Sequence, residues 1–266
     1  MTTSTRGTYL DRILENTLVE LDARKRSRSM SALIASAQQQ PEPIPFAAAL
    51  RGTRVTVIAE MKRASPSKGP IAPGAVAAEV AREYIDGGAA AISVLTDETF
   101  FGGSLGDLRD VARVARDRRV PVLRKDFVLD EYQIAEARAE GASAVLLIVA
   151  ALTSDRLREL LACAGEFGVE ALIEAHNDVE LDRALDAGAT TIGVNNRDLR
   201  AFTVDLATTE RLASRVPPNV TLVGESGIRT RDDVQRLGRV GVHAVLVGEA
   251  LMRATDRRAA LRELLS

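Results

Sequence analysis

The chain alternates short apolar segments with longer segments in which apolar residues recur at the spacing of a helix. The short segments are continuously apolar and rich in Val, Ile, Leu and Ala, a pattern typical of parallel strands that are covered by helices. They begin at Val57, Ala90, Val120, Ala144, Glu170, Thr191, Thr221 and Ala244. The helical patterns between them include residues 75–86, 105–117, 131–140, 153–167 and 178–187. This alternation predicts an α/β fold.

Eight strands, each followed by a helix, favour a closed (βα)8 barrel, or TIM barrel. Several helical patterns stop at a glycine just before the next strand, as expected of a left-handed helix end that recurs with every unit. These glycines are Gly88, Gly141, Gly168, Gly188 and Gly241. A doubly wound open sheet is the alternative. It is disfavoured because no Gly-x-Gly-x-x-Gly follows the first strand and because polar residues follow strands throughout the chain.

The segment before the first strand has the pattern of helices. A helix running to about Lys25 carries an apolar face that must bury against something. This face consists of Tyr9, Leu10, Ile13, Leu14, Leu18 and Leu21. A second helix is predicted over residues 31–38, and the prolines that follow end it before a short turn at residues 46–50. We therefore predict a helical extension at 1–53 and a barrel at 54–266. The basic cluster at 24–28 lies at a helix carboxyl end and is interpreted as a solvated face.

Composition narrows the function classes. The net charge of −2 and the pI near 5.9 argue against nucleic acid as a partner. No apolar stretch approaches the roughly 18 residues of a membrane span, and the first residues lack the apolar region of a signal peptide, so we expect a cytoplasmic protein. The single cysteine, Cys163, lies in a helical pattern and is interpreted as a packed thiol rather than a nucleophile. His176 and His243 lack the spacing of metal ligands and are interpreted as structural.

Polar side chains follow several of the predicted strands. Glu60 and Lys62 end the first strand and share one of its faces, because side chains alternate along a strand. Such a pair can bind an anion or move a proton, but it can also be a structural ion pair. Further strands end in Lys125, Glu174 and Asn195. The recurrence favours an active site at the carboxyl ends of the strands.

Six motifs in these positions resemble the indole-3-glycerol phosphate synthase family of tryptophan biosynthesis. They are EMKRASPSKG at 60–69, LRKDF at 123–127, LLIVAAL at 146–152, LIE at 172–174, GVNNRDL at 193–199 and ESGI at 225–228. The resemblance covers the whole chain in order and implies that the helical extension caps the barrel. It implies that 1-(2-carboxyphenylamino)-1-deoxyribulose 5-phosphate is converted to indole-3-glycerol phosphate with loss of CO2 and water. It implies neither a cofactor nor a metal.

The resemblance also implies roles for the catalytic residues. Lys125 is the general acid at the ketone oxygen, provided that desolvation or neighbouring cations lower the pKa of its ammonium. Glu174 works opposite it as the acid and base of dehydration. Lys62 binds the substrate carboxylate and is a candidate second proton donor, and Glu60 holds the Lys62 ammonium and contacts the sugar hydroxyls.

Other strand-end residues are expected to bind the substrate. The resemblance implies that Ser65 and Arg197 hold the anthranilate end and that Phe101, Phe127 and Leu199 form apolar walls around its ring. It implies further polar contacts from Asn195 and Glu225. A phosphate cradle is expected where the last two strands end and a short helix begins. It comprises Ser226, Gly227, Gly248 and Glu249, the last through its main chain only, with its carboxylate directed to solvent. The loop at 65–69 is a candidate lid.

Two functions from other classes remain open. A Schiff-base aldolase on the same barrel would use Lys125 as its nucleophile, which borohydride trapping would detect. A phosphometabolite-binding barrel without catalysis would need only the phosphate cradle. We expect a monomer whose ligand is a small phosphorylated molecule, with other enzymes of the tryptophan pathway as candidate protein partners.

Overall fold

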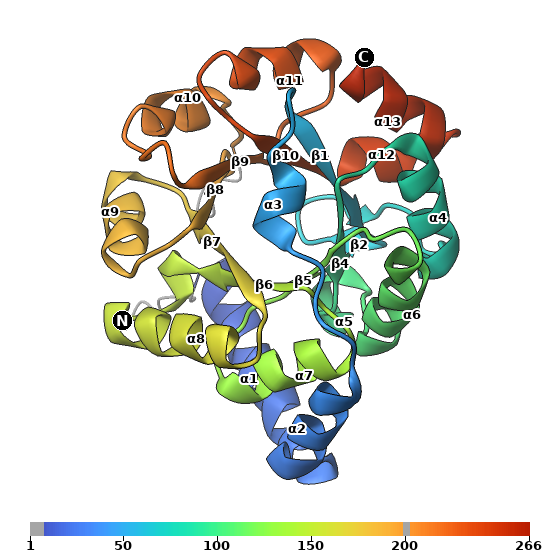
Figure 1. Ribbon diagram of the computed structural model, residues 1–266, viewed down its shortest axis with the longest axis vertical. Coiled ribbons are helices and arrows are strands. Elements are labelled where there is room, and N and C mark those ends of the chain that lie inside the picture. Colours follow the sequence, from blue (N-terminus) through green and yellow to red (C-terminus); the bar gives the residue numbers. More distant parts are fainter. Residues whose placement is uncertain (1–7, 199–202) are drawn as a thin grey trace, which may run out of the picture.

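Eight parallel strands close into a barrel in the computed structural model, which describes residues 8–198 and 203–266 (Figure 1). The strands are β1 (Thr56–Met61), β4 (Ala91–Leu95), β5 (Val122–Lys125), β6 (Ala144–Ile148), β7 (Glu170–Ala175), β8 (Thr191–Asn195), β9 (Thr221–Glu225) and β10 (Ala244–Val247). They neighbour one another in chain order, and β10 pairs with β1 to close the ring. The predicted TIM barrel is confirmed.

Helices cover the outside of the barrel. They are α4 (Ala77–Gly87), α6 (Leu105–Arg116), α7 (Glu131–Ala139), α8 (Ser154–Glu166), α9 (Asp178–Asp186), α10 (Ala207–Ala213), α11 (Arg231–Gly238) and α13 (Arg257–Leu265). Shorter elements are α5 (Glu98–Phe101), α12 (Glu249–Arg253), the 3-10 turn η1 (Val149–Ala151) and the small strands β2 (Ala64–Ser65) and β3 (Gly69–Pro70). The glycines predicted to end helices have positive φ angles, between 67° at Gly168 and 100° at Gly88.

Strand periodicity divides the core into two layers. Along β1, Ile58 points into the barrel, whereas Val57 and Ala59 point outward to the helices. The inner layer also contains Leu123, Leu146, Leu172, Val223 and Leu246. At the carboxyl ends of the strands the inward positions become polar, so the same alternation that builds the core directs the charged side chains into the barrel mouth.

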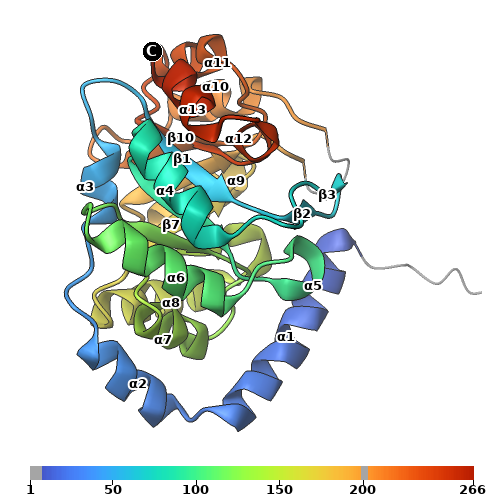
Figure 2. The ribbon, with the colours of Figure 1, turned by 90° about the vertical axis from the view of Figure 1, so that its right-hand side faces the viewer.

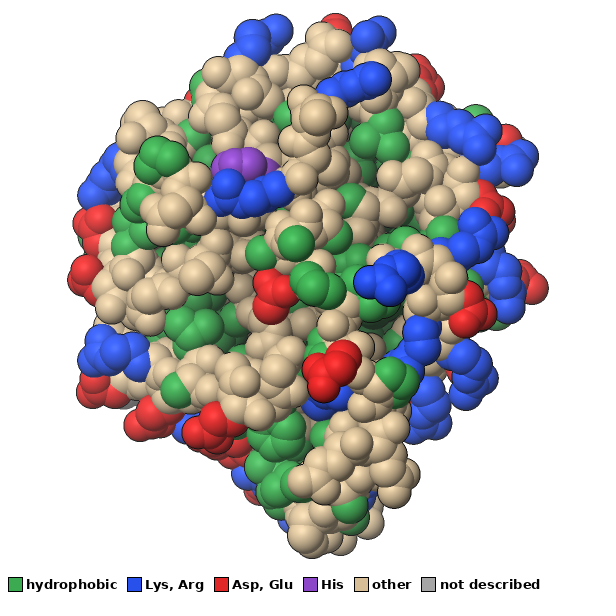
Figure 3. Space-filling model, viewed as in Figure 1, with side chains coloured by type: hydrophobic (Ala, Val, Ile, Leu, Met, Phe, Trp, Pro, Cys, Tyr) green, Lys and Arg blue, Asp and Glu red, His purple; other side chains and the backbone are tan. Residues whose placement is uncertain are grey.

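A short helix closes the opposite end of the barrel. Helix α3 (Phe46–Leu50) inserts Phe46 and Leu50, both fully buried, into the inner layer. The Glu170 carboxylate accepts hydrogen bonds from the backbone N–H groups of Phe46 at 2.6 Å and Ala47 at 2.9 Å. This carboxylate satisfies donors that a helix N-terminus leaves without an intrahelical partner. Charged side chains lie mostly around the rim of this end of the molecule (Figure 3).

Two further helices precede the barrel. Helix α1 (Tyr9–Ser27) lies at the same end as α5, β2 and β3, and α2 (Met30–Gln39) leads back toward α3 at the other end (Figure 2). Leu21 packs in one buried cluster with α2 and α7, while Ile13 and Thr17 are buried nearer the start of α1. The expectation that Leu18 shares this buried face is wrong, because its side chain is 52% exposed.

The basic cluster at the end of α1 contacts carboxylates rather than solvent alone. Arg24 Nε lies 3.1 Å from Glu136 Oε1, and Lys25 Nζ lies 2.7 Å from Asp130 Oδ2. Arg28 also pairs with a carboxylate at the far end of α7. The interpretation of this cluster as a solvated face is therefore wrong for Arg24, Lys25 and Arg28. The dipole of α1, on which that interpretation rested, could not show the acidic residues at α7 that face the cluster. Among the residues described, no helix is both long and apolar enough for a membrane span.

Candidate active site

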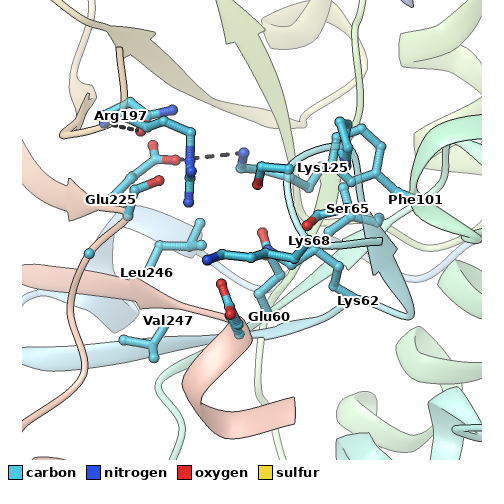
Figure 4. A pocket seen from close by; sticks show the side chains of 18 of the residues that line it. Glu60, Lys62, Ser65, Lys68, Phe101, Lys125, Arg197, Glu225, Leu246 and Val247 are labelled. Carbon is cyan, nitrogen blue, oxygen red and sulfur yellow. Dashed lines mark hydrogen bonds and ion pairs between the residues drawn. The ribbon is translucent and has the colours of Figure 1, made fainter. Parts of the chain in front are cut away.

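A cavity of about 580 Å³ opens at the carboxyl ends of the barrel strands. It is lined by every predicted site residue that the structure describes, which are Glu60, Lys62, Ser65, Phe101, Lys125, Phe127, Glu174, Asn195, Arg197, Glu225, Ser226, Gly227, Gly248 and Glu249. Leu199 lies outside the described residues. Figure 4 shows Lys125 and Glu225 directed toward one another across this cavity, with Phe101 and Ser65 on the Lys125 side.

Parallel register brings the strand-end side chains to one level. Leu95 pairs with Lys125, Ile148 with Glu174, and Asn195 with Glu225. Closing the sheet into a barrel staggers each strand relative to its neighbour. Inward-pointing residues at the ends of β5, β7, β8 and β9 therefore converge on the barrel axis. The convergence is a property of the closed sheet and needs no special loop.

Lys125 lies between two buried carboxylates. Its Nζ is 3.4 Å from Glu174 Oε2 and 3.7 Å from Glu225 Oε2, and its side chain is only 15% exposed. Burial by itself lowers the pKa of Lys125, but attraction to Glu174, Glu225 and Glu60 outweighs burial and raises the pKa above its ordinary value. The sequence-based expectation of a lowered pKa is therefore wrong. Lys125 is held as an ammonium, which is the form that a proton donor requires.

The two carboxylates beside Lys125 titrate in opposite directions. Burial raises the pKa of both, but Lys125 and the nearby imidazole of His176 bring the pKa of Glu174 well below its usual range. The pKa of Glu225 is raised by burial and by the nearby charge of Glu174. The charge of Lys125 therefore favours the ionised form of Glu174, while burial and the neighbouring charge of Glu174 favour the protonated form of Glu225.

Glu60 and Lys62 form the ion pair that the strand pattern predicted. Lys62 Nζ donates to Glu60 Oε1 at 2.6 Å, and both side chains are mostly buried in the cavity wall. Gly248 faces this pair, and a Cβ atom there would lie 2.4 Å from Glu60 Oε1. Gly248 is therefore required to seat Glu60, a function that the sequence-based phosphate role did not include.

Gly193 has the corresponding function on the other side of the barrel. A Cβ atom at this position in β8 would lie 2.0 Å from Glu225 Oε1. Sequence reasoning did not select Gly193, although a glycine inside a strand is a signal of close approach by another group. The buried carboxylates of Glu60 and Glu225 thus each occupy space that a glycine leaves open.

Contacts on the outer face of β5 hold the strand that carries Lys125 in place. Arg124 points away from the cavity and is 1% exposed. Its Nη1 donates to the Gln133 carbonyl at 2.7 Å and lies 3.2 Å from Glu136 Oε2, and its Nη2 donates to Asp126 Oδ2 at 2.9 Å. These contacts join the end of β5 to α7. Since Glu136 also pairs with Arg24, helix α1 is held by the same network.

Apolar side chains form one wall of the cavity. The rings of Phe101 and Phe127 lie 6.3 Å apart, centroid to centroid, and are tilted by 37°. Tyr9, Leu10 and Ile13 from α1 line the same cavity. The apolar face predicted for α1 therefore does bury partly against the site, and its first turn covers the cavity with Phe101 from α5 beside it.

The opposite part of the cavity is polar. Ser226 and Gly227 have positive φ angles of 65° and 83° where β9 ends, and α12 begins directly after β10. The partly exposed Glu249 carboxylate pairs with a residue of its own helix, since its Oε1 lies 3.2 Å from Arg253 Nε. Arg229 also lines this part of the cavity. Sequence reasoning missed both arginines, since neither stands at a strand end.

The comparisons with known proteins agree with this geometry. The family model described as indole-3-glycerol phosphate synthase matches residues 10–264. An indole-3-glycerol phosphate synthase of Roseiflexus sp. (strain RS-1) is 49% identical over 264 residues, which cover 97% of this chain and 98% of that protein. Indole-3-glycerol phosphate synthase 2 of Streptomyces coelicolor is 54% identical over 233 residues, covering 88% of this chain and 89% of the relative.

The chain belongs to the indole-3-glycerol phosphate synthase family. The enzyme class and pathway predicted from the sequence, a carboxy-lyase of tryptophan biosynthesis, are confirmed. A solved structure of 3-hexulose-6-phosphate synthase from Salmonella typhimurium has a TM-score of 0.64 at 15% identity, covering 79% of this chain and 96% of its own. Likeness at this identity shows the barrel fold alone.

His176, interpreted from the sequence as structural, lies next to the site. Its Nε2 lies 3.3 Å from Glu174 Oε1, a neighbour that the sequence-based interpretation did not include. The signal available was its position two residues after Glu174, which places both side chains on the same side of an extended segment. Cys163 is buried and its pKa is raised by burial to about 11, in agreement with a packed thiol. No group of three or more metal-ligating side chains occurs within residues 8–198 and 203–266.

Proposed function

We propose that Lys125 and Glu174 carry out the acid–base chemistry of indole-3-glycerol phosphate formation in this barrel. The observation that carries this proposal is the placement of the Lys125 ammonium within 4 Å of the buried carboxyl groups of Glu174 and Glu225, whose pKa values shift in opposite directions. Oppositely shifted titrating groups in one cleft are typical of catalytic sites.

Ring closure forms a bond between the aromatic carbon that bears the carboxylate and the ketone carbon. The electron pair of the carbonyl group moves to its oxygen, which takes a proton from the Lys125 ammonium. CO2 then leaves, and the electron pair of the broken bond restores the aromatic ring. Lys62 binds the departing carboxylate, while Glu60 fixes the Lys62 ammonium through the 2.6 Å hydrogen bond.

Dehydration completes the indole ring. One acid protonates the departing hydroxyl, one base removes a proton from the neighbouring carbon, and water is lost with both charges balanced. Glu174 is ionised and is suited to act as the base. Glu225, whose pKa is raised by burial and by the charge of Glu174, is the candidate acid of the same cluster. Asn195, at the end of β8, lies in the same cavity and contributes to the low pKa of Glu174.

The two ends of the substrate fit the two parts of the cavity. Phe101 and Phe127 provide an apolar wall for the anthranilate ring, with Arg197 and Ser65 as polar contacts. The phosphate fits the end formed by Ser226, Gly227, Gly248 and Glu249, where backbone N–H groups at the start of α12 lack intrahelical partners. Pairing of Glu249 with Arg253 offsets the charge that would repel a phosphate.

The proposed roles are tested by assaying the wild-type protein and Glu174→Gln with the synthetic substrate while following indole fluorescence. We expect the variant to lose most of its turnover while it keeps its fold, because the amide cannot accept the proton. Borohydride added during turnover is expected to trap no covalent adduct on Lys125. A trapped adduct would favour the aldolase, and an active Glu174→Gln variant would contradict the assignment of the base.

The surroundings of the enzyme follow from its chemistry. A phosphorylated metabolite does not cross a lipid bilayer readily, and we propose that this enzyme acts in the cytoplasm where its substrate is made. The monomeric state and any contact with other enzymes of the tryptophan pathway remain expectations from the sequence. Size-exclusion chromatography with light scattering would measure the first.

A further inference from the structure

The two oxygens of Glu174 have different partners. Oε2 faces the Lys125 ammonium at 3.4 Å, inside the cavity. Oε1 faces Nε2 of His176 at 3.3 Å, on the side of the loop that leads from β7 to α9. The carboxylate is only 3% exposed, so these partners, rather than water, determine its orientation. His176 itself is 10% exposed.

His176 is held in turn by a second carboxylate. Glu180 Oε2 lies 2.8 Å from His176 Nδ1 and accepts a hydrogen bond of 2.8 Å from the His176 backbone N–H. The other oxygen of Glu180 accepts from Asn177 Nδ2 at 2.7 Å, and Asn177 Oδ1 caps α9 by accepting from the Glu180 backbone N–H at 3.0 Å. The first turn of α9 therefore fixes Glu180, and Glu180 fixes the imidazole ring.

The imidazole lies between two negative charges. Burial lowers the pKa of His176, but its contacts with Glu174 and Glu180 dominate and raise the pKa to about 10. The other groups that face Glu174 are Lys125 on β5 and Glu225 on β9, while Glu60 on β1 acts on both of these. His176 is therefore a second cation, besides Lys125, in contact with the Glu174 carboxylate.

We propose that His176 is a positioning residue of the reaction centre, which binds Oε1 of Glu174 so that Oε2 is directed at Lys125 and the substrate. The chain Glu180, His176, Glu174 thus connects the first turn of α9 to the catalytic cluster. With His176 as an imidazolium, Glu174 stays ionised and free to accept a proton at neutral pH. This inference rests on the proposed role of Glu174 as the base of dehydration.

Kinetics of His176→Gln separate positioning from simple stabilisation. We expect kcat to fall about tenfold or more with a smaller change in KM, because the carboxylate loses its fixed orientation. The acid limb of the kcat–pH profile moves to higher pH, because Glu174 loses a neighbouring cation that lowers its pKa. Glu180→Gln leaves His176 in place, and because an imidazole is protonated at the acid limb with or without Glu180, we expect this variant to lower kcat less and to leave the limb almost unshifted.

His243→Gln is the matched control, since His243 is the other histidine of the chain. It lies at the amino-terminal end of the barrel, where its Nδ1 accepts a hydrogen bond of 3.0 Å from the Leu222 backbone N–H, and it does not line the cavity. We expect this variant to keep the wild-type kcat–pH profile. A structural role alone for His176 would lower the melting temperature of His176→Gln and leave its profile unchanged.

NMR titration of the histidine rings tests the contact without any assay of activity. The two variants assign the two ring signals, and we expect the His176 ring to stay protonated well above pH 7 in the wild type and to titrate lower in Glu180→Gln. A His176 ring that titrates at an ordinary pKa, or an unshifted kcat–pH profile in His176→Gln, overturns the proposal. Failure of the proposed function would instead appear as an active Glu174→Gln variant, with the His176 titration unaffected.

Discussion

At the barrel mouth, the charge of each catalytic side chain and the space that it occupies depend on its neighbours. Lys125 and His176 stabilise the ionised form of Glu174, while burial and the charge of Glu174 raise the pKa of Glu225 beside them. The carboxyl groups of Glu60 and Glu225 fit only because Gly248 and Gly193 lack side chains. Charge state and packing at this site therefore depend on each other.

Replacement of Lys125 tests the proton donor. We expect Lys125→Ala to lower kcat by about 10²- to 10⁴-fold, the range typical of a lost general acid, with substrate binding largely kept. Steady-state kinetics with the synthetic substrate measure the effect. A kcat within about threefold of the wild-type value would show that Lys125 is not the acid.

Replacement of Gly193 tests the space beneath Glu225. We expect Gly193→Ala to lower kcat by about tenfold or more, because the added methyl group displaces the Glu225 carboxyl group from its position beside Lys125. Gly165→Ala in α8 is the matched control, because its Cβ meets nothing within 4 Å, and it should keep full activity and gain slight stability. Equal kinetics in the two variants would contradict this assignment.

The close contact between Gly248 and Glu60 changes the expected effect of a substitution at Gly248. A phosphate cradle at this position predicts that a bulky residue blocks the main chain from the phosphate. In the structure, its Cβ also meets Glu60 Oε1 at 2.4 Å. Gly248→Val should therefore lower kcat as well as weaken substrate binding. Sulfate soaked into crystals of the wild-type protein is the cleaner test of the phosphate end, and an anion bound elsewhere would refute that placement.

At the scale of elements, two helices that do not belong to the repeating βα units cover the two ends of the barrel. Helix α3 closes one end with Phe46 and Leu50, and α1 covers part of the mouth at the other. Arg24 on α1 pairs with Glu136 on α7, which also contacts Arg124 behind the strand that carries Lys125. The extension is thus coupled to the barrel by both apolar and ionic contacts.

Truncation of the side chain at the closed end tests how much α3 contributes. We expect Phe46→Ala to lower the free energy of unfolding by about 3–5 kcal/mol, as for other large side chains removed from a core. Val19→Ala on the 69% exposed face of α1 is the control and should change it by less than about 0.5 kcal/mol. Urea unfolding followed by circular dichroism gives both values, and similar midpoints would mean that α3 does not contribute to the core.

At the scale of the whole molecule, the two histidines make stability depend on pH in opposite ways. Folded His176 keeps its proton to about pH 10, whereas an unfolded histidine releases it near 6.5. Its stabilising contribution is therefore complete below pH 6.5 and is lost as the pH rises toward 10. Burial lowers the pKa of His243 below 6.5, so its contribution is present above that pH and is lost in acid.

Urea unfolding of the wild type and the two histidine variants at about pH 5, 7 and 10 measures these contributions. We expect the stability difference between wild type and His176→Gln to be largest at the lowest pH and to shrink toward pH 10. The difference for His243→Gln should change in the opposite sense between pH 7 and 5. A His176→Gln difference that is constant across this range would be inconsistent with a raised pKa in the folded state.

The sequence by itself determined the barrel, its strand ends and the family. Continuous apolar strands and repeated helix-ending glycines depend on local periodicity, which is visible in one dimension. The same periodicity showed that Glu60 and Lys62 share a face. The motifs at the strand ends then named residues that do line one cavity.

Only the tertiary structure decided how these side chains affect one another. Whether the pKa of Lys125 falls or rises depends on carboxylates from β1, β7 and β9, which are distant in sequence and meet only when the sheet closes. The same holds for His176 beside Glu174 and for the acidic partners of Arg24. Periodicity fixes the direction in which a side chain points, but closure of the barrel fixes its neighbours, and electrostatic energies depend on those distances.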